Sequence, residues 1–91
     1  MVVAYRYLVS GRVQGVGFRF FTEDAAAREG LSGQARNLPD GRVEISVEGE
    51  AEAVARFERS IWQGPPGARV DDVLTETQPA TGRVTGFRIR G

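Results

Sequence analysis

The residues with the clearest capacity for chemistry lie in one glycine-rich segment, Gly11 to Phe21, which reads GRVQGVGFRFF. An apolar run precedes it and an alanine-rich run follows it, so the segment is predicted to join a strand to a helix. Glycines in such a turn let consecutive backbone N–H groups point into one concavity, where the helix N-terminus adds its positive end. Arg19, in the first helical turn, would bring a guanidinium that grips an anion through paired hydrogen bonds.

Three known glycine-rich motifs and a plain turn are alternatives to an anion site in this segment. The dinucleotide-binding fingerprint requires a third glycine where the chain has Phe20, and the Walker loop requires a lysine, which the chain lacks. The stretch QGVGFRFF faintly resembles an RNA-binding RNP1 motif, but it enters a helix instead of lying on a strand. A plain strand–helix turn with a solvated Arg19 fits the residues as well as an anion site does. The segment alone leaves both open.

The composition restricts the chemistry further. The 91 residues include no histidine and no cysteine, which excludes histidine acid–base steps, thiolate nucleophiles, disulfides and most zinc sites. All 12 basic residues are arginine and 12 acidic residues balance them, so no net charge favours nucleic acid or an anionic membrane. No signal peptide or transmembrane run is recognised. We expect a cytoplasmic protein that uses neither a metal nor another cofactor.

Hydrophobic periodicity predicts the elements that must position these groups. Strands are predicted at 2–10, 32–37, 42–48, 68–77 and 83–90, and helices at 18–29 and 50–63. This β-α-β-β-α-β order, with one more strand at the C-terminus, is typical of a ferredoxin-like α+β sandwich: an antiparallel sheet with both helices on one face. A chain of this length is expected to form a single domain over residues 1–91. We expect it to act as a monomer.

Two motifs together resemble the signatures of the acylphosphatase family. They are GRVQGVGFR, Gly11 to Arg19, and GQARNLPDGRVEISVEG, Gly33 to Gly49. The resemblance spans essentially the whole chain, and implies an enzyme that hydrolyses the carboxyl–phosphate bond of acyl phosphates to a carboxylate and inorganic phosphate. It also places the phosphate-binding arginine at Arg19 and the water-orienting asparagine at Asn37. The backbone cradle for the phosphate falls on Gln14, Gly15, Val16, Gly17 and Phe18.

Asn37 has a second interpretation by residue type. It precedes the turn sequence LPDG, and an asparagine in that place often bonds its own backbone at a strand end. The resemblance favours the water-orienting role. One departure from the family is Gln34, where relatives usually carry a bulky apolar residue, and we expect it to alter the packing beside Asn37. Asp40 is predicted to be a turn former. The sequence predicts solvated surface charges at Arg12, Arg36 and Arg42.

An acyl phosphate suits a site that lacks histidine. Its carboxylate leaving group has a conjugate acid with a pKa of about 4, so it departs unprotonated at neutral pH. Backbone N–H groups, one arginine and one amide would then act by positioning and electrostatics, with direct in-line attack of water and no phosphoenzyme. The alternative is a non-catalytic module that binds a phosphorylated metabolite or carbamoyl phosphate. Phosphate release, measured beside binding, separates these two classes.

Overall fold

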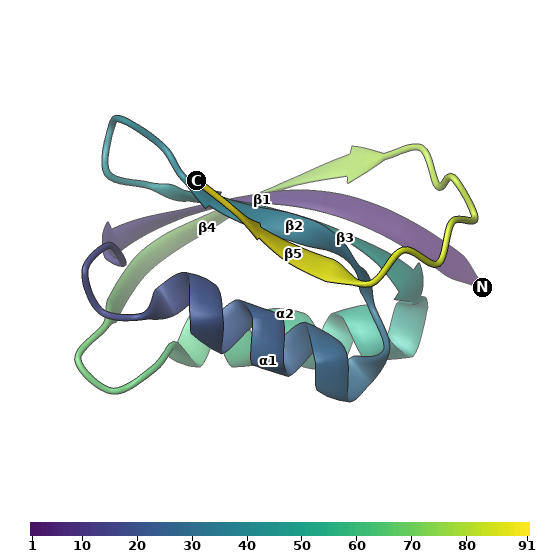
Figure 1. The fold of residues 1–91 in the computed structure, drawn as a ribbon, viewed down its shortest axis with the longest axis horizontal. Helices are drawn as coiled ribbons and strands as arrows, with labels where there is room; N and C mark the ends of the chain where they lie inside the picture. The colour runs from purple at the N-terminus through teal and green to yellow at the C-terminus, as the bar shows by residue number, and fades with distance from the viewer.

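The computed structural model describes all of residues 1–91 as two helices packed on one face of a five-stranded sheet (Figure 1). In chain order the elements are β1 (Val2–Arg12), α1 (Phe18–Glu29), β2 (Ser32–Asn37), β3 (Val43–Glu50), α2 (Ala51–Gln63), β4 (Arg69–Gln78) and β5 (Phe87–Arg90). The strands lie in the order β4-β1-β3-β2-β5. The predicted ferredoxin-like α+β fold is confirmed. Neither helix combines the length and the apolar character needed to cross a membrane.

The core lies between the helices and the sheet, and strand alternation explains its composition. Along β3, alternate residues point toward the helices, whereas the residues between them face the open side of the sheet. The helices supply the other half of the core from apolar residues at helical spacing. The largest fully buried apolar side chains are Tyr7, Val9, Val13, Phe18, Val43, Ile45, Val54, Phe57 and Ile61. This packing holds the N-terminus of α1 beside the end of β2.

The sheet differs from the prediction in one pairing, because β5 runs parallel to β2. The other neighbouring strands are antiparallel, so β4 and β2 run in opposite directions. The loop of residues 79–86 crosses the end of the sheet where β4 finishes, and β5 returns along β2 (Figure 1). A strand that turns back from β4 at that end must be parallel to β2. The expectation of a fully antiparallel sheet was therefore wrong for this strand.

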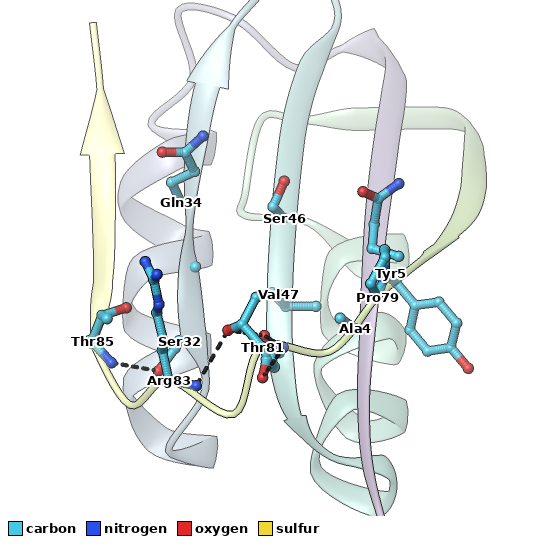
Figure 2. A pocket seen from close by; sticks show the side chains of 13 residues that line it. Ala4, Tyr5, Ser32, Gln34, Ser46, Val47, Pro79, Thr81, Arg83 and Thr85 are labelled. Carbon is cyan, nitrogen blue, oxygen red and sulfur yellow. Dashed lines mark hydrogen bonds between the residues drawn. The ribbon is translucent and has the colours of Figure 1, made fainter.

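The last strand is also shorter than predicted, since β5 begins at Phe87 and not at residue 83. The residues before it belong to the crossing loop and have partners outside any strand ladder. The Thr85 N–H donates to Ser32 Oγ at 3.0 Å, as Figure 2 shows, and Gly86 has a φ of 76°. Alternating polar and apolar residues over 83–90 fit a strand locally, but the contact of Thr85 with Ser32 and the left-handed Gly86 keep the first half a loop.

Candidate active site

The turn between β1 and α1 has the backbone shape that the glycine motif predicts. Gly15 and Gly17 have φ values of 74° and 76°, in the left-handed region that favours glycine. A Cβ added at either position would meet no atom within 4 Å, so the backbone conformation and not crowding requires glycine. Gly17 is the N-cap residue of α1, and no side chain caps this end of the helix. The first turn of α1 contains no acidic residue.

The backbone N–H groups of this turn are without partners in the protein. Those of residues 15–20 donate no hydrogen bond to another protein atom, and the first to do so is the Phe21 N–H, which donates to the Gly17 carbonyl at 3.0 Å. Helices leave their first N–H groups unpaired, and the dipole there favours a negative charge. Without an acidic side chain in the first turn, this end of α1 is suited to an external anion.

Arg19 and Asn37 come together at this turn from separate elements. Arg19 belongs to the first turn of α1, and Asn37 is the last residue of β2. They line one hollow of about 220 Å³. The other lining residues are Val13, Gly15, Gly17, Phe18 and Phe20. Two predicted cradle residues are not in that lining: Val16 packs against the core, and Gln14 is bonded elsewhere.

The Arg19 guanidinium is held from one side by the C-terminal strand. Its Nη1 donates to the Arg90 carbonyl oxygen at 2.9 Å, whereas Nε and Nη2 make no hydrogen bond within the protein. The Nε–Nη2 edge is thus free to donate two parallel hydrogen bonds to a phosphoryl group or carboxylate. The sequence did not predict the Arg90 contact, because every residue has a backbone carbonyl and the residue type does not show which one will accept.

Asn37 does not close the turn that follows it. Its side chain makes no hydrogen bond to the backbone around it, and the turn is closed by the Leu38 N–H, which donates to the Arg42 carbonyl at 2.8 Å. Asp40 supplies the side-chain contact, accepting from the Arg42 N–H at 3.1 Å, as predicted for a turn former. That backbone hydrogen bond, with the Arg42 guanidinium, lowers the pKa of the Asp40 carboxyl. The half-buried Asn37 amide therefore keeps its hydrogen-bonding capacity for the hollow.

Gln14 connects the glycine turn to this β2–β3 turn. Its Nε2 donates to the Leu38 carbonyl at 2.8 Å and to the Arg42 carbonyl at 3.1 Å. The sequence indicated only that Gln14 contributes backbone to a cradle. Its polar side chain between Val13 and Gly15 was the signal that it has a partner of its own, but only the fold identifies that partner.

Gln34 does not pack in the way that the sequence suggested. Gln34 and Asn37 are an odd number of residues apart along β2, so their side chains point to opposite faces of the sheet. The Gln34 Oε1 accepts a hydrogen bond from Arg90 Nη1 at 3.1 Å, on the neighbouring strand. The polar residue is thus accommodated by β5, not by the packing beside Asn37.

The predicted surface arginines differ in their surroundings. Arg12 is exposed, and Arg42 pairs with Asp40 at 2.8 Å. Arg36 instead donates to Glu44 at 2.6 Å, and this carboxylate is buried on the open face of the sheet. Burial would raise the pKa of Glu44, but hydrogen bonds from Arg36 and Arg6 outweigh it and lower the pKa. Arg36 is therefore part of an ion-pair network.

A larger hollow, of about 500 Å³, lies beside the crossing loop and contains none of the predicted phosphate or water contacts. Figure 2 shows its lining, with Gln34 and Ser46 on neighbouring strands and Thr81 and Arg83 on the loop. Its one carboxylate, Glu48, is already bonded to that loop. Nowhere do three or more His, Cys, Asp or Glu side chains gather as a set that could ligate a metal.

Comparisons with known proteins identify a family over nearly all of the chain. The family model described as Acylphosphatase matches residues 5–89. An acylphosphatase of Rubrobacter xylanophilus is 55% identical over 85 residues, which are 93% of this chain and 77% of that protein. One from Anaeromyxobacter dehalogenans is 51% identical over 88 residues, 97% of this chain and 95% of that protein.

Solved structures agree with these relatives. The crystal structure of acylphosphatase from Bacillus subtilis superposes with a TM-score of 0.93 at 37% identity, over 100% of both chains. Full-length HypF, in a phosphate- and nucleotide-bound form, matches 100% of this chain with 12% of its own length, at a TM-score of 0.87 and 29% identity. The same fold therefore also occurs inside a much larger protein.

Proposed function

The chain belongs to the acylphosphatase family, hydrolases of acid anhydrides, and from this premise we propose which of its groups cleave an acyl phosphate. Arg19 and the backbone of residues 14–18 hold the phosphoryl group, and Asn37 orients the attacking water. One observation carries the proposal: Arg19 and Asn37 line the same hollow, beside backbone N–H groups that have no protein partner.

The phosphoryl oxygens would be bound from two sides. The unpaired N–H groups at the N-terminus of α1 donate from the backbone, and the Nε–Nη2 edge of Arg19 donates from the side chain. The Arg90 carbonyl holds Nη1 on the far side, which restricts the guanidinium before substrate arrives. Charge that builds on the phosphoryl oxygens during transfer is then met by donors already in place.

The water is the nucleophile, and the Asn37 amide is the side chain available to orient it. The water oxygen forms a bond to phosphorus while the bond from phosphorus to the acyl oxygen breaks, and the electron pair leaves on the carboxylate. The water proton passes to a phosphoryl oxygen, so the products are a carboxylate and inorganic phosphate. Positioning of this kind can account for a large part of a rate enhancement without a covalent intermediate.

We propose that the reaction needs no metal, on the ground of its leaving group. A carboxylate departs without a proton or a Lewis acid, unlike the alkoxide of a phosphate monoester. Exhaustive chelation should leave hydrolysis intact. A large loss of activity that magnesium or zinc restores would overturn this part of the proposal.

We also propose that one chain forms the complete site. The partners found for Arg19 and Gln14 lie in the same chain, in β5 and in the β2–β3 turn. Activity per molecule should then stay constant when the protein is diluted, because no subunit contact needs to form. A fall in activity per molecule on dilution would show that a second copy contributes.

The direct test is phosphate release from acetyl phosphate or benzoyl phosphate by the purified protein, with phosphate binding measured in parallel. Turnover with competitive inhibition by inorganic phosphate is expected, because the same donors recognise the phosphoryl group in both. Binding without release would instead support a non-catalytic module. Purely noncompetitive inhibition would place the phosphate somewhere other than the Arg19 hollow.

A further inference from the structure

Gln14 makes the direct hydrogen-bonded connection between the two halves of the site. Its single amide nitrogen donates to two carbonyls, of Leu38 at 2.8 Å and of Arg42 at 3.1 Å. Leu38 follows Asn37 directly in the chain. No other hydrogen bond joins residues 13–20 to residues 37–42.

The β2–β3 turn does not need Gln14 for its own closure. The Leu38 N–H donates to the Arg42 carbonyl at 2.8 Å, the Gly41 N–H to the Leu38 carbonyl at 3.1 Å, and Asp40 accepts from the Arg42 N–H. The two bonds from Gln14 are additional, and both cross from the glycine turn. What they add is the placement of one turn relative to the other.

We propose that Gln14 is a positioning residue, which sets the separation between the phosphoryl group held by α1 and the water held by Asn37. This inference rests on the function proposed above. In-line attack is sensitive to misplacement, and a shift of about 1 Å can lower a rate by about 100-fold. A half-buried amide that bonds two fixed carbonyls has little freedom to move. The Gln14 side chain therefore acts on the water through the β2–β3 turn, and not on the substrate.

The chemistry of the amide explains why glutamine serves here. Two separate hydrogen bonds to two backbone carbonyls need two hydrogens, and the NH₂ of glutamine carries both on one atom. A methionine of similar length fills the same space but donates nothing. Gln14→Met thus removes the connection while keeping the packing, and Gln14→Ala removes both.

The experiment is a double-mutant cycle with Asn37, read as kcat and as the inhibition constant of inorganic phosphate. In the wild-type background Gln14→Met and Gln14→Ala should each lower kcat by roughly 10- to 100-fold, with phosphate inhibition changed less than about 3-fold. In the Asn37→Ala background the same substitutions should lower kcat by less than about 3-fold, because no oriented water remains to misplace.

Asp40→Ala is the matched control, since it removes two contacts with Arg42 inside the same turn but neither the Gln14 amide nor the two carbonyls that accept from it. It should lower thermal stability slightly and leave kcat within about 3-fold of wild type, because Asp40 neither lines the hollow nor bonds Gln14. If Asp40→Ala lowers kcat as much as Gln14→Met does, turn stability and not the connection is responsible, and the inference fails.

Three further results would overturn the assignment. Folded Gln14→Met with unchanged kcat would show that the connection has no role in turnover. Equal losses in both backgrounds would mean that Gln14 acts independently of Asn37, and a parallel loss of phosphate affinity would assign it to phosphate binding. The proposed function is tested separately by Asn37→Ala alone: if that variant keeps its kcat, the water-orienting role fails whatever Gln14 does.

Discussion

Two loops of this molecule present backbone N–H groups that could bind an anion, but only one of them is bonded to a carboxylate of the protein. At the crossing loop, the Thr81 N–H donates to Glu48 Oε2 at 2.9 Å and the Gly82 N–H donates to the same carboxylate. Figure 2 shows this loop lying against the sheet through Thr81. At the glycine turn before α1, the N–H groups of residues 15–20 have no protein partner. One loop is bonded to a carboxylate of the protein itself, and the other has its donors free for a ligand.

The local backbone does not distinguish the two loops. Gly17 and Gly82 have φ values of 76° and 75°, and a Cβ on either would meet nothing within 4 Å. The difference is whether the fold brings an acidic side chain to the N–H groups. Glu48 on β3 bonds the crossing loop, whereas the first turn of α1 has no acidic residue and contains Arg19. A glycine-rich turn therefore indicates a ligand site only where no side chain of the protein has taken its donors.

The largest effect is expected at Arg19, the cation beside the glycine turn before α1. Arg19→Gln removes charge and paired donation in both the bound and the transition state, so kcat/KM should fall by roughly three orders of magnitude and phosphate inhibition should weaken. Arg19→Lys should recover little of this, because a point charge cannot make the paired contact. Kinetics of phosphate release measure both. Full recovery with lysine would argue against recognition by a two-pronged guanidinium.

Asn37→Ala should come next, with a different signature. The water contact matters mainly in the transition state, so kcat should fall by roughly two to three orders of magnitude while the phosphate inhibition constant changes little. The variant should be checked for folding by circular dichroism, since Asn37 borders a turn. A folded variant with near-normal kcat would remove Asn37 from the mechanism.

Matched alanine substitutions at Gly17 and Gly82 compare the two loops directly. Because both residues are left-handed with open space around them, each substitution should cost a similar free energy of unfolding, about 1 to 2 kcal/mol. Only Gly17→Ala should also lower kcat/KM, by roughly 10-fold or more, because the N–H groups of the turn around Gly17 are proposed to hold the phosphoryl group. Denaturant unfolding and phosphate release give the two readouts. Equal losses of activity would contradict the separation of a structural from a functional loop.

The smallest effect is expected for Glu48→Gln, which alters only the carboxylate bonded to the crossing loop. Hydrogen bonds from the Thr81 backbone N–H, the Gly82 N–H and the Thr81 hydroxyl hold the pKa of the Glu48 carboxyl below its usual range. A carboxyl with a lowered folded-state pKa stabilises the fold above its unfolded pKa, and this contribution is lost as the pH falls through the folded value. Melting temperatures measured from neutral pH to below pH 4 should therefore fall less steeply for Glu48→Gln than for wild type. Activity at neutral pH should not change.

The elements of this fold were accessible from local pattern. Helix α1 and strand β2 were predicted over 18–29 and 32–37, where the structure has them, because helical spacing, strand alternation and glycine stops are properties of neighbouring residues. The direction and length of β5 were not accessible. They depend on where β4 ends and on contacts such as that of Thr85 with Ser32, which lie far apart in the chain.

For the site, the sequence by itself determined the residue types: glycines that permit a left-handed turn, Arg19 in the first turn of a helix, and an amide at the end of a strand. The motif resemblance added which reaction those types serve. The tertiary structure decided that Arg19 and Asn37 share one hollow, that Arg90 holds one side of the guanidinium, and that Gln14 spans the two turns. Backbone conformation follows from neighbouring residues, whereas a hydrogen bond to a distant carbonyl exists only once the sheet has brought the two segments together.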